Sequence, residues 1–303
     1  MPEVREITSG LKFPEGPIAL PDGSVLLVEI QRGTLTRVAP DGKTTVAATT
    51  GGGPNGAALG PDGKVYICNN GGFEWHELGP FLLPGNQPAN YLGGSIQRVD
   101  LPSGKVETLF TSVAGNTLRG PNDLVFDATG GFWFTDHGKT RPRDRDRGGL
   151  YYVSPDLSDV REVIYPLDGP NGVGLSPDGR RVYVAETHTG RVFFWELSAP
   201  GQVRPHVSPN QGHLLAGLPG LQLLDSLAVD SDGNVCVATL VNGGITVISP
   251  DGGKIEHVPM PDPLTTNICF GGKDLRTAYI TLSATGKLVS MPWPRPGLRL
   301  AFG

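Results

Sequence analysis

The stretch FPEGPIALPDGSVLLVE, residues 13–29, places a Pro-Glu-Gly tripeptide ahead of an apolar run, a tight turn and a second apolar run. The Asp22-Gly23 pair is typical of a β-hairpin turn, because glycine tolerates the positive φ that such turns require. The stretch therefore predicts a hairpin with Glu15 at the start of its first strand. Whether Glu15 has a special role depends on whether the chain repeats this arrangement.

The turn and its second strand return five times along the chain. The later copies are GPDGKVYICNN (60–70), FDATGGFWFTDH (126–137), LSPDGRRVYVAETH (175–188), VDSDGNVCVATL (229–240) and the weaker GGKDLRTAYITL (271–282). Each copy is followed by a glycine-led strand pattern and a further turn, as in GTLTRVAPDGK (33–43), so one unit holds four strands. Units of this length, separated by loop insertions, are typical of propeller blades.

The repeats predict an all-β chain that forms one six-bladed β-propeller domain over residues 1–303. The first strand of each blade is expected to start near residues 15, 55, 122, 171, 225 and 267. The N-terminal VREIT (4–8) has strand character, and we expect it to pair near residues 286–294 and close the last blade, which leaves no open sheet edge there.

Counting back eight residues from each turn glycine gives one polar side chain per unit. In the sixth unit Leu275 stands in the glycine register. The six residues are Glu15, Asn55, Asn122, Asn171, Asp225 and Asn267. Because the first strands of a propeller line its central channel, these six residues should form a ring there. We call them the channel ring.

The composition of the channel ring suggests a metal site. Asn and Asp often form turns near strand starts, and Pro-Asn-Gly is an ordinary turn tripeptide, but this alternative does not explain a polar residue in all six units. Two carboxylates with amide oxygens favour Ca²⁺, with Mg²⁺ or Mn²⁺ next, whereas Zn²⁺, also possible, prefers nitrogen or sulfur. A cation would also relieve the repulsion between two acids on one axis.

The composition of the chain argues against several classes of binding partner. The 44 Gly and 28 Pro are spread between apolar runs, as turns in a β-rich fold would be. A net charge of −5 argues against nucleic acid as a partner. Three cysteines far apart in the sequence (Cys68, Cys236 and Cys269) make neither a metal motif nor a disulfide framework. The start MPEVREITSG has no signal-peptide pattern and no run reaches membrane-span length, so we expect a cytoplasmic monomer or weak homo-oligomer with no membrane partner.

Several motifs together resemble one family. They are EGP (15–17), RGPNDLVFDATGGFWFTD (119–136), PNGVGLSPDGRRVYVAET (170–187), DSLAVDSDGNVCVAT (225–239) and TTNICFGG (265–272). Across nearly the whole chain they are similar to the senescence marker protein/gluconolactonase/luciferin-regenerating-enzyme family.

The resemblance implies a six-bladed propeller with a divalent metal in the channel. It also implies four metal ligands, namely Glu15, Asn122, Asn171 and Asp225. The spacing is similar to that of diisopropyl fluorophosphatase, in which the same four kinds of ligand hold a catalytic calcium. Asn55 and Asn267 stand at positions that are not ligands in every member, so we assign them to substrate or metal-bound water.

The surroundings of the ring offer further candidates. The second strand of a blade runs antiparallel to the first, so residues at its end should flank the ring. These residues are Asn69 and Asn70, Asp136 and His137, Glu186 and His188, and Leu240 to Asn242. The loop 71–94 is long and aromatic, which suggests a substrate lid, the alternative being a small satellite core over one blade. Trp75 in this loop, together with Arg119 and His137, is a candidate substrate contact.

These observations lead to the hypothesis of a metal-dependent hydrolase of a cyclic ester, a gluconolactonase-like lactonase. The cation would polarise the carbonyl and Asp225 would act as general base, with a water activated by the cation itself as the variant. Asn55, Arg119 and Asn267 would orient substrate hydroxyls. The alternatives are a phosphotriesterase-like or cyclic-ketone hydrolase on the same cation and, from another class, a non-catalytic calcium-binding or partner-binding propeller.

Overall fold

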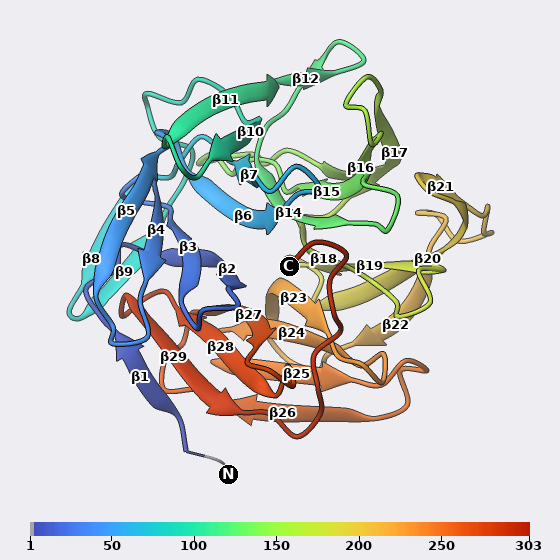
Figure 1. Cartoon of the computed structure of the whole chain (residues 1–303). Coiled ribbons are helices and arrows are strands. Elements are labelled where there is room, and N and C mark those ends of the chain that lie inside the picture. Colours follow the sequence, from blue (N-terminus) through green and yellow to red (C-terminus); the bar gives the residue numbers. More distant parts are fainter. Residues whose placement is uncertain (1–2) are drawn as a thin grey trace.

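Six small antiparallel sheets surround a central channel in the computed structural model, which describes residues 3–303 (Figure 1). The described chain contains strands and no helix. The predicted all-β, six-bladed propeller is therefore confirmed.

Each blade runs outward from an inner strand at the channel. Blade 1 consists of β2 (Pro14–Ala19), β3 (Val25–Glu29), β4 (Thr34–Val38) and β5 (Thr44–Thr49). Blade 2 consists of β6 (Pro54–Leu59), β7 (Val65–Asn69), β10 (Ser95–Asp100) and β11 (Lys105–Phe110). Blade 3 consists of β14 (Pro121–Phe126), β15 (Phe132–Asp136), β16 (Gly148–Val153) and β17 (Val160–Leu167).

The second half of the chain repeats the plan. Blade 4 consists of β18 (Pro170–Leu175), β19 (Arg181–Glu186), β20 (Arg191–Ala199) and β22 (His213–Gly217), with the short β21 (Gln202–Val203) also on β20. Blade 5 consists of β23 (Leu223–Val229), β24 (Val235–Leu240), β25 (Gly244–Ile248) and β26 (Ile255–Pro259). Blade 6 consists of β27 (Thr265–Gly271), β28 (Thr277–Leu282), β29 (Lys287–Pro292) and β1 (Arg5–Thr8).

The predicted closure is present. Strand β1 pairs antiparallel with β29, with Arg5 opposite Ser290 and Glu6 opposite Val289. Two further hairpins lie outside the blades, β8 (Trp75–Leu78) with β9 (Phe81–Pro84), and β12 (Ser112–Val113) with β13 (Asn116–Thr117). The inner strands begin within two residues of the predicted positions.

The turn between the first two strands of each blade has a residue in the left-handed backbone region. Five of these residues are the predicted glycines, with φ between +66° and +92°. In blade 6 the position is held by Leu275 at φ +57°. The sixth repeat therefore keeps the turn even though its glycine is replaced.

Each inner strand carries a β-bulge beside its channel-ring residue. In blade 1 the pairing moves from Glu15–Val28 to Ile18–Leu26, which leaves one extra residue on β2. The same shift occurs in the other five inner strands. A bulge breaks the regular alternation of side chains and re-aims the residue at that point. The repeat thus presents a polar side chain at the same position of every inner strand.

Glycines after the ring residues let neighbouring inner strands touch. A β-carbon on Gly16 would lie 2.6 Å from the Asn55 carbonyl oxygen, and one on Gly172 would lie 2.5 Å from the Leu227 nitrogen. Pro170, Asn171 and Gly172 lie inside β18, so the turn interpretation of the Pro-Asn-Gly tripeptide is wrong. The glycine there serves close backbone packing.

Gly172→Ala is expected to lower the free energy of unfolding by about 2–3 kcal/mol, because the added methyl overlaps the backbone of blade 5. Gly217→Ala, in which the nearest heavy atom is a side-chain carbon at 3.7 Å, is the matched control and should change it by less than about 0.5 kcal/mol. Urea unfolding of both variants measures the difference. Equal stabilities would contradict the close packing around the channel.

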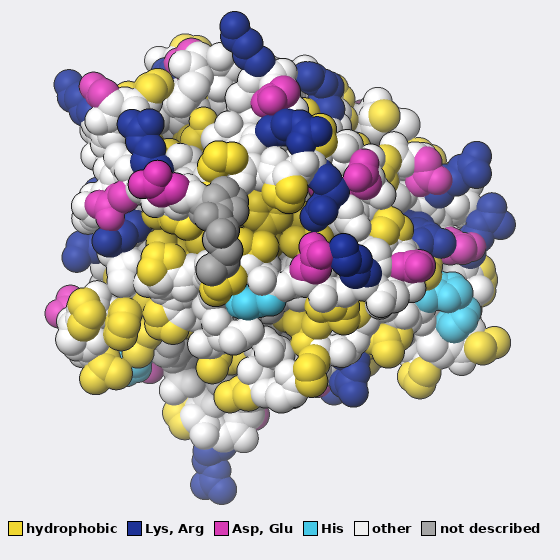
Figure 2. All heavy atoms as spheres, turned by 90° about the horizontal axis from the view of Figure 1, so that it is seen from below, with side chains coloured by type: hydrophobic (Ala, Val, Ile, Leu, Met, Phe, Trp, Pro, Cys, Tyr) yellow, Lys and Arg dark blue, Asp and Glu magenta, His cyan; other side chains and the backbone are white. Residues whose placement is uncertain are grey.

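The described residues contain no helix long and apolar enough to cross a membrane. On the side of the molecule seen in Figure 2, acidic and basic side chains are interspersed.

Candidate functional site

All six channel-ring side chains are withdrawn from solvent. Their residues are between 1% exposed (Glu15) and 8% exposed (Asp225). The first and last blades meet directly at the ring, where the Asn267 Nδ2 donates a hydrogen bond of 2.8 Å to the Glu15 Oε2. The backbone N–H of Gly16 donates to the same oxygen at 2.7 Å.

The ring carboxyls lie in an unfavourable electrostatic environment. Burial raises the pKa of Glu15 well above its usual range, and the charge of Asp225 raises it further. Burial also raises the pKa of Asp225 to about 7, while the neighbouring side chain of Asn171 opposes the rise. Neither carboxyl has an ion-pair partner within residues 3–303. The site therefore favours a positive charge that the described side chains do not supply.

Two ring amides have buried oxygens without a partner. The Oδ1 atoms of Asn122 and Asn171 accept no hydrogen bond from the described part of the chain. The amide of Asn171 is anchored from its other end, because its Nδ2 donates to the Thr187 Oγ1 at 3.1 Å. A buried unpaired oxygen costs about 1–3 kcal/mol, and an ion at the site is one explanation for such an atom.

These oxygens fit a hard cation. Glu15 and Asp225 supply carboxylates, and Asn122 and Asn171 supply amide oxygens, which are the ligand types that Ca²⁺ takes. Over residues 3–303 no three His, Cys, Asp or Glu side chains gather in a metal-binding group. A cation in the channel would therefore depend on the amide oxygens as well as on the acids.

A third acid, Asp123, lies beside the ring, and the sequence analysis did not single it out. It is 7% exposed, and its carboxylate accepts hydrogen bonds from the backbone N–H groups of Leu124 at 2.9 Å and Val173 at 3.4 Å. Burial raises its pKa to about 7. The signal was available, because the residue after the ring position is a glycine in blades 1, 2 and 4 and an acid only here.

Two of the predicted substrate contacts, Asn55 and Asn267, lie in the channel ring, whereas Arg119 lies at the surface. Asn55 lies in the ring, on the inner strand of blade 2. The amide of Asn267 is already bonded to Glu15 and, through Oδ1, to the Ile268 N–H at 2.8 Å. Arg119 is exposed, and its backbone N–H donates to the Asp136 Oδ2 at 2.7 Å.

His137 follows β15 directly, at the end of the channel where the inner strands begin, which we call the ring face. Its imidazole is half-buried, and its ring centre is 5.2 Å from that of His188. Burial and then the neighbouring His188 lower its pKa to about 3. His137 is therefore a neutral imidazole at physiological pH.

The loop 71–94 is tied to several blades. The Leu82 N–H donates to the Ala284 oxygen of blade 6, and the Gln87 N–H donates to the Thr140 oxygen, both at 2.8 Å. Trp75 packs on Phe13, with ring centres 5.2 Å apart. Figure 1 shows β8 and β9 beside blade 1, away from the channel axis. The hairpin thus packs beside blade 1, while Phe73 and Tyr91 of the same loop lie around the Lys139 Nζ, in the loop that follows β15.

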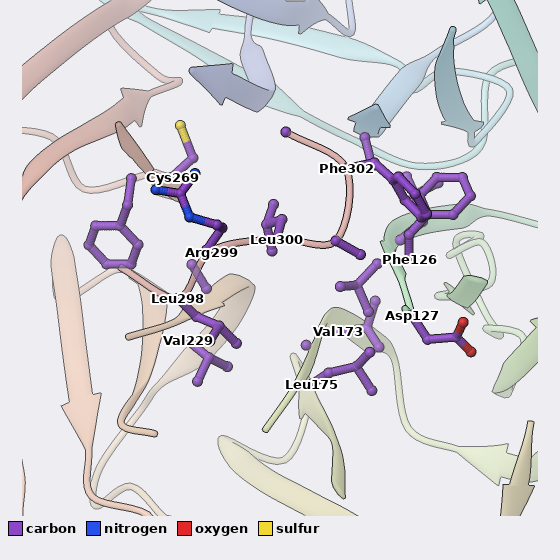
Figure 3. A pocket seen from close by; sticks show the side chains of 18 of the residues that line it. Phe126, Asp127, Val173, Leu175, Val229, Cys269, Leu298, Arg299, Leu300 and Phe302 are labelled. Carbon is purple, nitrogen blue, oxygen red and sulfur yellow. The ribbon is translucent and has the colours of Figure 1, made fainter. Parts of the chain in front are cut away.

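A cavity of about 1600 Å³ lies on the opposite side of the ring. It reaches from Gly16, Asp123 and Asn267 to the hairpin turns of the inner strands, an end of the channel that we call the turn face. The C-terminal segment 298–303 crosses this cavity (Figure 3). Its Leu298 N–H donates to the Val229 oxygen at 2.9 Å, and the Phe302 ring packs against Phe126.

Fold and ring together define a six-bladed propeller with a cluster of buried carboxylate and amide oxygens in its channel. Residues 13–284 match the family model described as the SMP-30/Gluconolactonase/LRE-like region, so the chain belongs to this family.

Individual relatives agree with that assignment. The chain is 30% identical over 264 residues to "Lactonase drp35" of Staphylococcus haemolyticus. This match covers 86% of this chain and 73% of the relative. It is 27% identical to the "Gluconolactonase" of Zymomonas mobilis, and that match covers 92% of this chain and 79% of the relative. Among solved structures, the gluconolactonase XC5397 of Xanthomonas campestris shares the fold with a TM-score of 0.75 at 22% identity, over 96% of this chain and 89% of that one.

Proposed function

We propose that this protein is a divalent-cation-dependent hydrolase of a lactone. The observation that carries the proposal is the pair of unpartnered amide oxygens, Asn122 Oδ1 and Asn171 Oδ1, beside two buried acids of the same ring. The names of the relatives, lactonase and gluconolactonase, support the substrate class.

The cation would be held by Glu15, Asn122, Asn171 and Asp225, with Ca²⁺ the best match to an all-oxygen set. When bound, it supplies charge neutralisation for the acids and polarisation of the substrate carbonyl. Asn267 and the Gly16 N–H orient Glu15 for this role through their hydrogen bonds to Oε2.

Asp225 is the proposed general base. It removes a proton from a water while that water's oxygen forms a bond to the carbonyl carbon of the lactone. The bond between that carbon and the ring oxygen then breaks, the ring oxygen takes up a proton, and the product is an open-chain hydroxy acid. Asn55, Arg119 and His137 remain proposed contacts to the substrate, whereas Trp75 packs on Phe13 beside blade 1 and is no longer proposed as one. The neutral imidazole of His137 suits hydrogen bonding better than ion pairing.

The test is acid release from a panel that contains D-glucono-δ-lactone, an unsubstituted aliphatic lactone, a cyclic ketone and a phosphotriester, each with calcium and with a blank that lacks protein. Release from at least one lactone above the blank is expected. Turnover of the phosphotriester or of the ketone alone would replace the lactone assignment. No turnover of any compound, with calcium bound, would favour a binding propeller.

A further inference from the structure

A second register of residues lies next to the channel ring. In blades 4 and 6 the residue that follows the second strand donates a hydrogen bond to the carbonyl just before the ring residue of the next blade. The Thr187 Oγ1 donates to the Leu224 oxygen at 2.7 Å, and the Ser283 Oγ donates to the Pro14 oxygen at 2.5 Å. Asn70 follows β7 in the same way. Its hydrogen bond with Lys139 places Asn70 against the loop that follows β15 of blade 3.

The carboxamide of Asn70 has one engaged end and one free end. Its Oδ1 accepts hydrogen bonds from the Gly72 N–H at 2.8 Å and from the Lys139 Nζ at 3.2 Å. Its Nδ2 is buried and has no partner among the residues that the structure describes. The residue as a whole is 2% exposed. Because the oxygen is committed to two donors, the group left to meet a ligand is the N–H₂.

Lys139 fixes this orientation. It is 2% exposed, its Nζ also donates to the Gly72 oxygen at 2.6 Å, and it stands 4.0 Å from the centre of the Phe73 ring. Burial lowers its pKa to about 7, while the charges of Asp136 and Asp146 oppose the fall. The flipped amide is unfavourable because its N–H₂ would face two donors, the Gly72 N–H and the Lys139 Nζ, in place of an acceptor.

We propose that Asn70 is a substrate-binding residue whose Nδ2 donates a hydrogen bond to an oxygen of the lactone or of its hydroxy-acid product, with Lys139 as the positioning residue that holds the amide. The proposal deepens the lactone-hydrolase assignment and rests on it. The sequence predicted only that Asn70 lies near the ring. The structure adds that its Oδ1 accepts two hydrogen bonds and that its Nδ2 has no partner among the described residues.

The decisive variant is Asn70→Asp, since it keeps an oxygen for Gly72 and Lys139 but removes both N–H donors. We expect its melting temperature to equal or exceed that of the wild type, while the KM for the best lactone rises about 10- to 100-fold. Asn70→Ala should show the same rise in KM with a lower melting temperature. A wild-type KM in Asn70→Asp would overturn the proposal and leave Asn70 a structural residue.

Lys139→Met tests the positioning role. It should raise KM several-fold in the wild-type background and add nothing in the Asn70→Asp background, because the donor is then already absent. An equal added effect in both backgrounds would contradict action through Asn70.

Asn69→Asp is the matched control. The Asn69 amide is bonded at both ends, with Oδ1 accepting from the Gly53 N–H and Nδ2 donating to the Gly51 oxygen, both at 2.8 Å. This variant should lose stability and keep its KM. A rise in KM like that of Asn70→Asp would show that the effect is not specific to Asn70.

A failure of the proposed lactone-hydrolase function can be distinguished from a failure of the Asn70 proposal. If the wild type releases no acid from any lactone, the proposed function fails on that result alone. The same variants are then compared by calorimetry for binding of gluconate. Weaker binding to Asn70→Asp than to the wild type supports the donor role, and equal binding or none by the wild type overturns it.

Discussion

Asp225→Asn is expected to lower kcat for lactone hydrolysis by about 10³-fold and to leave the propeller folded. The substitution keeps the shape of the side chain but removes both the base and one of the two carboxylates proposed to hold the cation. Because Asp225 raises the pKa of Glu15 through its charge, its neutralisation also removes a buried repulsion. Without a divalent cation, the variant should therefore melt at a higher temperature than the wild type at pH 8.

Asp232→Asn serves as the control for this variant. This substitution makes the same acid-to-amide change on the exposed β23–β24 turn. The kcat and the melting temperature of the Asp232→Asn variant should therefore stay close to those of the wild type. Full activity in Asp225→Asn would remove Asp225 from the mechanism. A lower melting temperature without cation would contradict the predicted repulsion in the ring.

The stability of the cation-free protein should fall as pH rises from about 4 to about 7. Burial raises the pKa of Asp123 and of Asp225 to about 7 and that of Glu15 well above its usual range. In this window the folded state keeps protons that the unfolded state has lost, so each rise in pH favours unfolding. The contribution of each aspartate is up to about 4 kcal/mol. Burial lowers the pKa of His137 to about 3, so titration of this residue makes the protein more stable as pH rises to about 6.5.

Comparison with Asp225→Asn separates these contributions, because both proteins keep His137. Urea unfolding of the two proteins across the pH range, in chelator, should show a steeper decline in the wild type. A saturating divalent cation should remove the decline and add about 3 kcal/mol at a hundred times its dissociation constant. Parallel curves for the two proteins, or no stabilisation by any divalent cation, would contradict a charged cation site in the channel.

The sequence was sufficient to predict the architecture because the repeat is carried by local turn chemistry. A residue with positive φ is needed at one point in each blade, and even Leu275 adopts it at φ +57°. The register from that turn back to the inner strand is constant, so Glu15 and Asn267 could be expected in one ring although 252 positions separate them.

Other features could not be read from the sequence because they depend on packing between blades. Nothing in the spacing of Pro170-Asn171-Gly172 marks its glycine as the point of contact with Leu227 of the next blade. The aromatic residues of loop 71–94 find partners outside their own blade, Phe13 for Trp75 and Lys139 for Phe73, and the sequence marks neither pair. The free donor of Asn70 follows from Lys139, 69 positions away, and no spacing in the sequence marks that pair.

The most direct test of the central claim is a calcium titration of lactone hydrolysis after chelation. Hydrolysis by the chelated wild-type protein should fall to the blank and return in full with one equivalent of bound calcium, and it should not return in a Glu15→Gln, Asn171→Ala double variant. Undiminished hydrolysis in chelator, with calcium confirmed absent, would contradict a catalytic cation held by the channel ring.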